Sequence, residues 1–164
     1  MKDQNITLFD RLQLIFLSFF GTGYAPKAPG TAGSIATIPL ILLLDYLSLS
    51  FSAVIVFTLI IFILACFSAQ FIQEKFKTHD PGWIVIDEVV GMLITWLFIF
   101  PTINWQGLLL VFILFRVFDI FKIFPASWAD KKMKSGAGTI IDDVISALYA
   151  GIVLLIIRKF LYPF

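Results

Sequence analysis

Five stretches of apolar residues make up most of this chain and limit what it can fold into. They cover residues 31–47, 51–72, 89–100, 107–124 and 140–157. A helix needs about 20 apolar residues to cross a bilayer. The segments therefore predict membrane-spanning helices, of which the shorter ones tilt or begin below the headgroups. A further apolar segment, residues 8–20, predicts a helix that lies in the membrane interface.

The composition indicates that lipid is the solvent for much of this surface. Hydrophobic residues make up 60% of the 164 residues and charged residues only 14%, whereas soluble domains are about half apolar and a quarter charged. A chain of this length cannot bury so much apolar surface within itself. We therefore expect an all-α, polytopic membrane helical bundle, a single domain over residues 1–164 with about five membrane segments and an N-terminal interfacial helix.

The basic residues are distributed unequally between the two sides of this predicted topology. Only Arg158 and Lys159 of the 12 basic residues fall on one side, and the other ten lie on or next to the opposite side. The positive-inside rule places the N-terminus and the two long loops in the cytoplasm. The net charge of +1 favours no nucleic-acid partner, and the sequence does not indicate an oligomeric state.

Six of the 11 acidic residues lie at the predicted cytoplasmic ends of apolar segments, together with the single histidine. These residues are His79, Asp80, Asp87, Glu88, Asp119, Asp142 and Asp143. A carboxylate at the centre of a membrane helix costs about 2.5–3.5 kcal/mol, so we expect Arg116, Lys122 or a bound divalent cation to neutralise them. Oxygen ligands with few nitrogens favour Mg²⁺ over Zn²⁺.

Two acidic pairs stand near the predicted starts of helices. Asp87 and Glu88 open the third segment, and Asp142 and Asp143 open the fifth. Neighbouring side chains can reach one metal ion at a helix start, although acidic residues there also complement the helix dipole without any ligand. Two such pairs on one side of the membrane favour the metal-binding interpretation. Gly91, one turn after Asp87, would allow another helix to approach closely.

Arg116, Asp119 and Lys122 are spaced three residues apart and therefore share one face of a helix. They form either a simple ion-pair ladder or a phosphate site, in which Arg binds phosphate in bidentate fashion and Lys supplies a point charge. His79 begins a predicted turn. It is either a ligand or general acid/base, since its pKa lies near neutrality, or a solvated loop histidine.

A loop rich in Gly and Pro, residues 21–34, leads into the first membrane segment. Thr31 and Ser34 are candidate N-caps there. The free N–H groups of a helix N-terminus favour an anion, so both are candidates for binding substrate phosphate. The alternative is an ordinary turn, and the small residues 135–139 before the fifth segment are open to the same two interpretations.

Taken together, these motifs resemble the phosphatidylglycerophosphatase A family over roughly residues 21–151. Four blocks in order carry the resemblance: residues 29–34 (PGTAGS); residues 79–80 (HD) with 85–91 (VIDEVVG); residues 115–119 (FRVFD) with Lys122 and Pro125; and residues 136–138 (GAG) with Asp142 and Asp143. The family often has Gly at the position of Ser135 and Ile at that of Thr139. These two departures lie in a loop.

The resemblance implies a Mg²⁺-dependent hydrolase of the bacterial inner membrane with its active site facing the cytoplasm. It would remove the terminal phosphate of phosphatidylglycerophosphate to give phosphatidylglycerol, with membrane lipid as its surroundings. We predict the following roles: metal binding by Asp87, Glu88, Asp142 and Asp143; phosphate binding by Thr31, Ser34, Arg116 and Lys122; catalysis by His79, Asp80, Asp87, Arg116 and Asp119. Attack by water and an aspartyl-phosphate intermediate both remain open.

Three other functions compete with this prediction. Intramembrane carboxylates also mark the ion paths of divalent-cation or proton-coupled transporters, but such residues often lie near the midplane and within repeated halves. No repeat is visible here. A phosphotransferase acting on CDP-activated lipids would carry an Asp-Gly and Ala-Arg signature, which is absent. A scaffold without catalysis gives no reason for six acidic residues at these positions.

Overall fold

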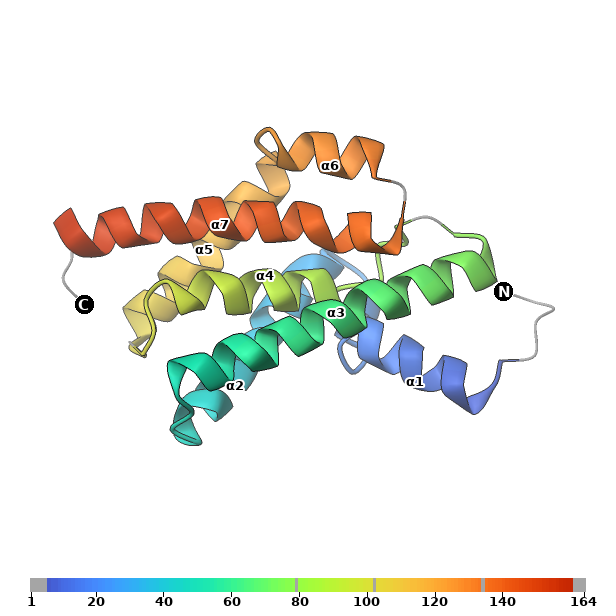
Figure 1. Ribbon diagram of the computed structural model, residues 1–164, viewed down its shortest axis with the longest axis horizontal. Helices are drawn as coiled ribbons and strands as arrows, with labels where there is room; N and C mark the ends of the chain where they lie inside the picture. Colours follow the sequence, from blue (N-terminus) through green and yellow to red (C-terminus); the bar gives the residue numbers. More distant parts are fainter. Residues whose placement is uncertain (1–5, 79, 102, 134, 161–164) are drawn as a thin grey trace.

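The computed structural model describes residues 6–78, 80–101, 103–133 and 135–160, and this part of the chain contains helices and no strand (Figure 1). The all-α prediction is confirmed. The elements are α1 (Leu8–Leu17), the short 3₁₀ helix η1 (Thr22–Tyr24), α2 (Pro29–Tyr46), α3 (Phe51–Phe76), α4 (Ile86–Leu97), α5 (Trp105–Phe121), α6 (Ala126–Lys132) and α7 (Gly136–Phe160).

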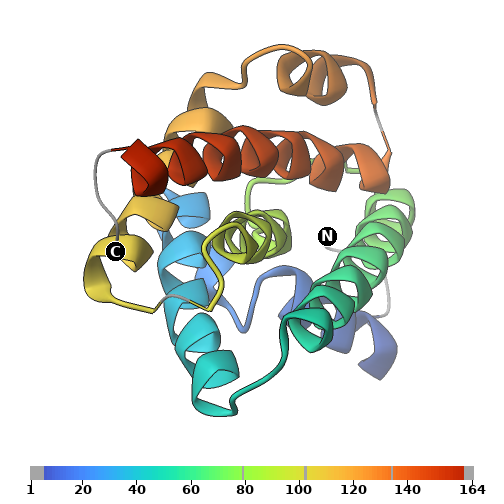
Figure 2. The ribbon, with the colours of Figure 1, turned by 60° about the vertical axis from the view of Figure 1, so that its left-hand side comes forward.

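The short helix α4 forms the centre of the bundle. It contacts α2, α3, α5 and α7, and a view close to its axis shows these helices around it (Figure 2). Nine of its 12 residues are buried, among them Met92, Leu93 and Trp96 with no exposed surface. The acidic pair in the first turn of α4 is therefore carried into the interior by the most deeply buried helix.

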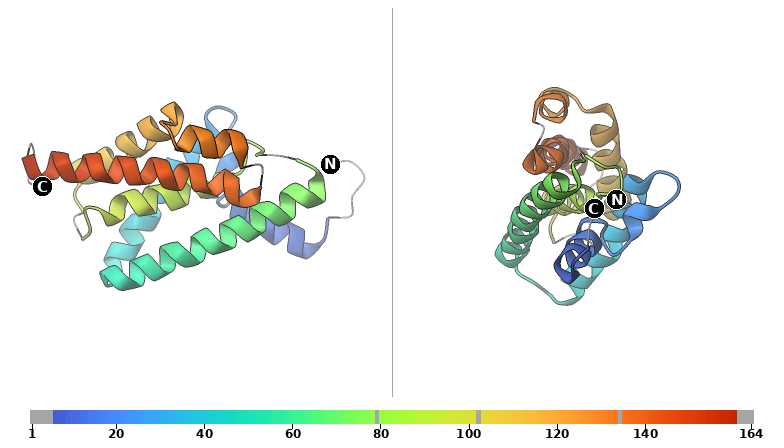
Figure 3. Two further views of the ribbon diagram at one scale, coloured as in Figure 1. Left: turned by 45° about the horizontal axis from the view of Figure 1, so that its top comes forward. Right: turned by 90° about the vertical axis from the view of Figure 1, so that its right-hand side faces the viewer.

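The direction in which the chain runs brings one end of each of three helices together. The end of α3 and the starts of α4 and α7 lie at the same end of the bundle (Figures 1 and 3). α6 packs along the outside of α7, and α1 packs against α3. This arrangement confirms that acidic residues from separate parts of the sequence meet at one end of the molecule.

Several helix boundaries differ from the sequence-based prediction. The third predicted segment, residues 89–100, is α4 at Ile86–Leu97, so Asp87 and Glu88 do lie in a first helical turn. The fifth begins earlier than predicted, at Gly136. Asp142 and Asp143 therefore lie about two turns into α7 and not at its start. The seven-residue helix α6 was not predicted, because its sequence is short and charged.

Two of the described helices, α3 and α7, are long and apolar enough to cross a membrane. The prediction of five crossing segments is not confirmed, since α4 has 12 residues and α5 has 17. At 1.5 Å per residue these helices reach only about 18 and 26 Å, short of a hydrocarbon core of about 30 Å. The outer face of α3 exposes large apolar side chains, including Leu59, Ile63 and Phe67.

The N-terminal helix α1 is joined to the bundle by a buried ion pair. Thr7 caps its start in a capping box with Asp10. The Asp10 carboxylate, with no exposed surface, also accepts from Lys75 Nζ of α3 at 2.6 Å. The opposite side of α1 exposes Leu8, Phe9 and Leu12, the apolar face that the predicted interfacial helix requires.

Candidate active site

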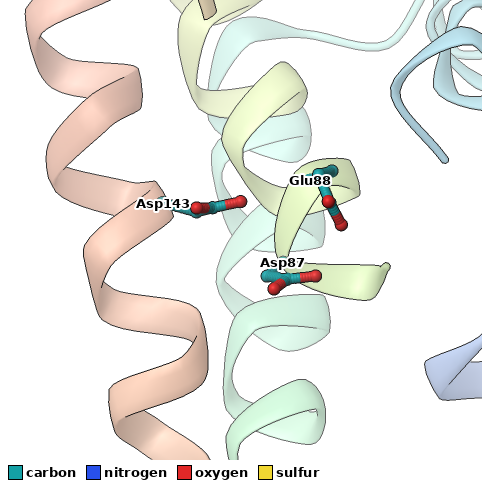
Figure 4. Close-up of side chains that lie close together, drawn as sticks. All are labelled: Asp87, Glu88 and Asp143. Carbon is teal, nitrogen blue, oxygen red and sulfur yellow. The ribbon is translucent and has the colours of Figure 1, made fainter. Parts of the chain in front are cut away.

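Three carboxylates from two helices converge at the acidic end of the bundle. Asp87 and Glu88 extend from the first turn of α4, and Asp143 points toward them from α7 (Figure 4). One oxygen of each side chain lies within 4.8 Å of an oxygen of the others. Asp143 is 2% exposed and Asp87 is 9% exposed, so water solvates these negative charges poorly.

Two oxygens of this cluster lack hydrogen-bond partners among the described residues. They are Asp87 Oδ1 and Glu88 Oε2, and both are buried. Burying an ionised carboxylate without a partner is strongly unfavourable. Fixed, inward-facing oxygens of this kind are the ligands that a hard divalent cation takes. The cluster therefore fits Mg²⁺, with Asp87, Glu88 and Asp143 as the residues that would hold it.

A guanidinium from α5 lies directly beside the acidic cluster. Arg116 Nη1 lies 2.5 Å from Asp119 Oδ2 and 3.6 Å from Glu88 Oε1. The pairing with Asp119 spans one helical turn, as the spacing predicts. Arg116 Nε is buried and has no hydrogen-bond partner in the described part of the chain. Arg116 thus keeps a donor available next to the carboxylates.

Lys122, which ends α5, is surrounded by carboxylates from three helices. Its Nζ contacts Asp142 Oδ2 and lies 3.8 Å from Asp143 Oδ1, 4.0 Å from Asp119 Oδ1 and 3.5 Å from Asp130 Oδ1. Asp142 therefore pairs with this lysine and is not part of the three-carboxylate cluster. The two cations Arg116 and Lys122 face more carboxylates than they can neutralise.

The close approach of helices around the site requires small residues. A methyl group at Gly91 would lie 2.2 Å from the ring of Phe115, so only glycine lets α5 pack against α4 here. A methyl group at Gly30 of α2 would lie 2.0 Å from Glu88 Oε1 and 3.1 Å from Arg116 Nη1. The expectation that Gly91 allows a close helix approach is confirmed.

Two glutamines on α3 hold the start of α7 in place. Gln70 Oε1 accepts from the backbone N–H of Gly136 at 2.6 Å, which satisfies one of the free donors of that helix. Gln73 Nε2 donates to Thr139 Oγ1 at 2.9 Å, and both groups are buried. These contacts fix the turn that precedes Asp143. Nothing in the local sequence of α3 signals this role, because the partners lie 66 residues away.

The structure places the remaining predicted residues as follows. α2 begins at Pro29 with Ala28 as its N-cap, so neither Thr31 nor Ser34 caps the helix. Ser34 is fully buried and donates to Gly30 O at 2.9 Å. Gly30, one turn earlier, is the residue of α2 that lies next to Glu88 and Arg116. Asp80 lines a small cavity with Asp142 and Asp130. His79 lies outside the described residues.

Asp130 is a site residue that the sequence analysis missed. It lies on α6, where it stands beside Lys131 and Lys132 and looks like part of a solvated charge run. The fold turns α6 back over α7, and Asp130 thereby reaches Lys122. No local pattern identifies this contact, because it depends on how the chain reverses between α5 and α7.

Unpaired buried carboxylate oxygens next to an available guanidinium donor are the groups that a phosphate-handling site requires, and they occur here in a helical protein with large apolar exposed faces. Comparison with known sequences identifies the family. Residues 15–158 match the profile of "Phosphatidylglycerophosphatase A", and the chain belongs to this family of membrane-associated lipid phosphatases. The resemblance inferred from the four motifs is confirmed.

Individual relatives agree with this assignment. The chain is 40% identical over 156 residues to phosphatidylglycerophosphatase A of Haemophilus influenzae, covering 94% of this chain and 93% of the relative. It is 35% identical over 132 residues to the Escherichia coli protein of the same name, covering 79% and 73%. A Bacteroides thetaiotaomicron relative is 32% identical over 143 residues, covering 85% and 89%, and its name refers to phosphatidylinositol 3-phosphate. No solved structure matches the chain significantly.

Proposed function

We propose that this protein hydrolyses the terminal phosphate monoester of phosphatidylglycerophosphate, releasing phosphatidylglycerol and inorganic phosphate. The observation that carries the proposal is the convergence of Asp87, Glu88 and Asp143 beside Arg116, with unpaired oxygens and an unpaired guanidinium donor facing the same region. The family assignment and the names of the two phosphatidylglycerophosphatase relatives supply the substrate.

Mg²⁺ is the cofactor that this donor set fits. Asp87, Glu88 and Asp143 would hold it, and a bound Mg²⁺ would supply Lewis-acid stabilisation of negative charge on the phosphoryl group. Asp142 was predicted as a fourth ligand. Its Oδ2 pairs with Lys122 while its Oδ1 has no hydrogen-bond partner among the described residues, so it contributes charge next to the metal site.

The protein's own side chains account for binding and orientation. Arg116 donates from Nε to a phosphate oxygen, and Asp119 and Glu88 hold its guanidinium in place through Nη1. Lys122 balances Asp142 and Asp143 and adds positive charge at the edge of the site. Donors that are fixed before the reaction stabilise charge in the transition state without reorganising.

The leaving glycerol oxygen must gain a proton, and we assign the donation of this proton to Asp80 or His79. Asp80 precedes the turn into α4 and lines a small cavity together with Asp142. Gly30 in the first turn of α2 lies next to Glu88 and Arg116, and Thr31 and the other backbone N–H groups of that turn adjoin it in the sequence. We propose that they contact the remaining phosphate oxygens.

We further propose that the bundle crosses the bacterial inner membrane with α2, α3, α4, α5 and α7 as its five membrane segments. The short helix α4 is tolerated because the surrounding helices shield it from lipid. α1 lies in the interface with its apolar face toward the membrane. The excess of basic residues at the acidic end of the bundle orients the site toward the cytoplasm.

The test is phosphate release by the detergent-purified protein, with Mg²⁺ and with excess EDTA. Phosphatidylglycerophosphate and phosphatidylinositol 3-phosphate are compared in parallel, because one relative's name refers to the latter lipid. We expect metal-dependent release from phosphatidylglycerophosphate and a much lower rate with the inositol lipid. Folded protein that releases no phosphate under either condition would refute the phosphatase, and cation flux in proteoliposomes would then test the transporter alternative.

The chemistry of attack is tested by the stereochemistry at phosphorus and by trapping. A single in-line attack by water inverts the configuration of an isotopically chiral phosphate, whereas an aspartyl-phosphate intermediate needs two displacements and retains it. An acyl phosphate on the protein that reacts with hydroxylamine also indicates this intermediate, for which Asp87 and Asp143 are the candidates because they lie in the buried cluster.

A further inference from the structure

An apolar groove runs along the bundle next to the acidic cluster. It has a volume of about 180 Å³ and lies between α3, α4 and α7. One wall is formed by Ile55, Thr58, Leu59 and Phe62 of α3. The only polar side chain in that wall, Thr58, donates its hydroxyl to Val54 O at 2.8 Å. The groove therefore presents no unsatisfied polar group to an occupant.

Two of the helices that line the groove also carry carboxylates of the site. On α7, its lining residue Val144 directly follows Asp143. On α4, its lining residue Ile94 lies seven residues after Asp87, two turns farther along nearly the same face and about 10 Å deeper. Measured along α4 and α7, the groove thus lies beyond the carboxylates, toward the opposite end of the bundle.

We propose that this groove binds one acyl chain of the lipid substrate while its headgroup is held at Asp87, Glu88 and Asp143. The inference rests on the proposed phosphatase function. A lipid whose terminal phosphate is held at the carboxylates would direct its acyl chains along the bundle, and this groove lies in that direction, on the same helices as Asp87 and Asp143. Leu59, half exposed at the rim, leaves the groove open to surrounding lipid.

In the proposed topology lipid surrounds the sides of the bundle, so the groove gains little from burying apolar surface as such. Its contribution comes from van der Waals contact with a chain of matching shape, as in helix packing within membranes. The expected consequence is selectivity for chain length. Substrates with acyl chains long enough to reach Ile94 should be processed better than substrates whose chains end before it.

The experiment fills the groove and compares two substrates. Ile94→Phe fills it from α4, and Leu59→Trp fills it from the rim of α3, so two independent variants guard against a folding defect in one. The matched control is Val56→Phe. This residue lines a separate groove of about 410 Å³ on α3, with Ser52, Ala53, Phe57 and Ile60, away from the acidic cluster.

kcat/KM is measured in mixed micelles with long-chain and with dihexanoyl phosphatidylglycerophosphate. We expect the filled variants to lose about tenfold with the long-chain lipid and to keep the wild-type rate with the short-chain lipid. The control should match wild type with both. Equal losses on both substrates, or no loss on either, would overturn the proposal.

A second measurement does not depend on turnover. Phosphatidylglycerophosphate carrying a photoreactive group near the end of one acyl chain is crosslinked to the protein in the presence of EDTA, and the labelled peptide is identified. Labelling of the α3 segment around Thr58 that Ile94→Phe abolishes supports the groove. Labelling that is spread evenly over the lipid-facing helices contradicts it. A wild-type protein without phosphatase activity would refute the proposed function, and this labelling would still decide the groove.

Discussion

Asp143 Oδ1 lies 3.8 Å from Lys122 Nζ, while the same carboxylate belongs to the cluster with Asp87 and Glu88. Asp143 therefore links the two halves of the site, the candidate metal ligands of α4 and the lysine that ends α5. Any change in its charge acts on both halves at once. This position makes Asp143 the most informative residue to substitute.

Asp143→Asn should reduce phosphate release by about 100-fold or more, because one anionic ligand is lost and Lys122 loses a partner. The apparent Mg²⁺ requirement should also rise. Both are measured from the rate of phosphate release as a function of Mg²⁺ concentration. Asp45→Asn is the matched control. Asp45 lies near the C-terminal end of α2, whereas the N-terminal end of that helix lies at the site, so this variant should behave as wild type. Full activity of Asp143→Asn at low Mg²⁺ would contradict the ligand assignment.

Arg116→Lys should lower kcat/KM by about 10²-fold although the positive charge is kept. A lysine offers one point of contact, whereas Arg116 pairs with Asp119 and Glu88 and still has Nε available. Steady-state kinetics check this. Arg158→Lys, at a guanidinium that donates to Ile99 O near the other end of α7, should change little. Equal effects of the two variants would show that charge alone matters at position 116.

Gly91→Ala should destabilise the bundle by about 1–3 kcal/mol, because the new methyl group would overlap the Phe115 ring at 2.2 Å. Phe115→Leu in the same chain should restore part of that loss. Thermal unfolding in detergent measures both effects. The control is Gly82→Ala, where an added methyl group meets nothing within 4 Å. A Gly91→Ala protein as stable as this control would mean that α4 and α5 can move apart freely.

The Asp10–Lys75 pair should make the attachment of α1 sensitive to acid. Hydrogen bonds from Lys75 and Thr7 lower the pKa of Asp10 from 3.8 to about 2. A group whose pKa is lowered on folding stabilises the fold fully above its unfolded pKa of 3.8, and this stabilisation is lost as the pH falls through about 2. Asp10→Asn should therefore lower the Tm at pH 6, and the difference from wild type should shrink as the pH falls below 4.

Thermal unfolding of both proteins across this pH range tests the prediction, since other carboxylates titrate equally in both. Lys75→Met should remove the same pH-dependent stabilisation of the fold. It should leave the capping contact between Thr7 and Asp10 unchanged. A difference in Tm that stays constant from pH 6 to pH 2.5 would show that the ion pair does not stabilise α1.

Much of the candidate site was predictable because charged residues are conspicuous in an apolar sequence. Asp87 and Glu88 stand out in an apolar sequence, and an unpaired carboxylate there is costly enough to imply a ligand. Gly91 was likewise recognisable from its one-turn spacing. Asp130, Gly30, Gln70 and Gln73 were not recognised, because each acts on a partner that lies far away in the sequence.

The sequence by itself determined the helical class, the apolar surface and most of the candidate site residues, because hydrophobic periodicity and isolated charges are local properties of the chain. Only the tertiary structure decided which of those residues lie together. It grouped Asp143 with Asp87 and Glu88, and it paired the neighbouring Asp142 with Lys122. Adjacent residues on a helix point about 100° apart, so helix packing alone assigns one carboxylate to the candidate metal site and the other to the lysine.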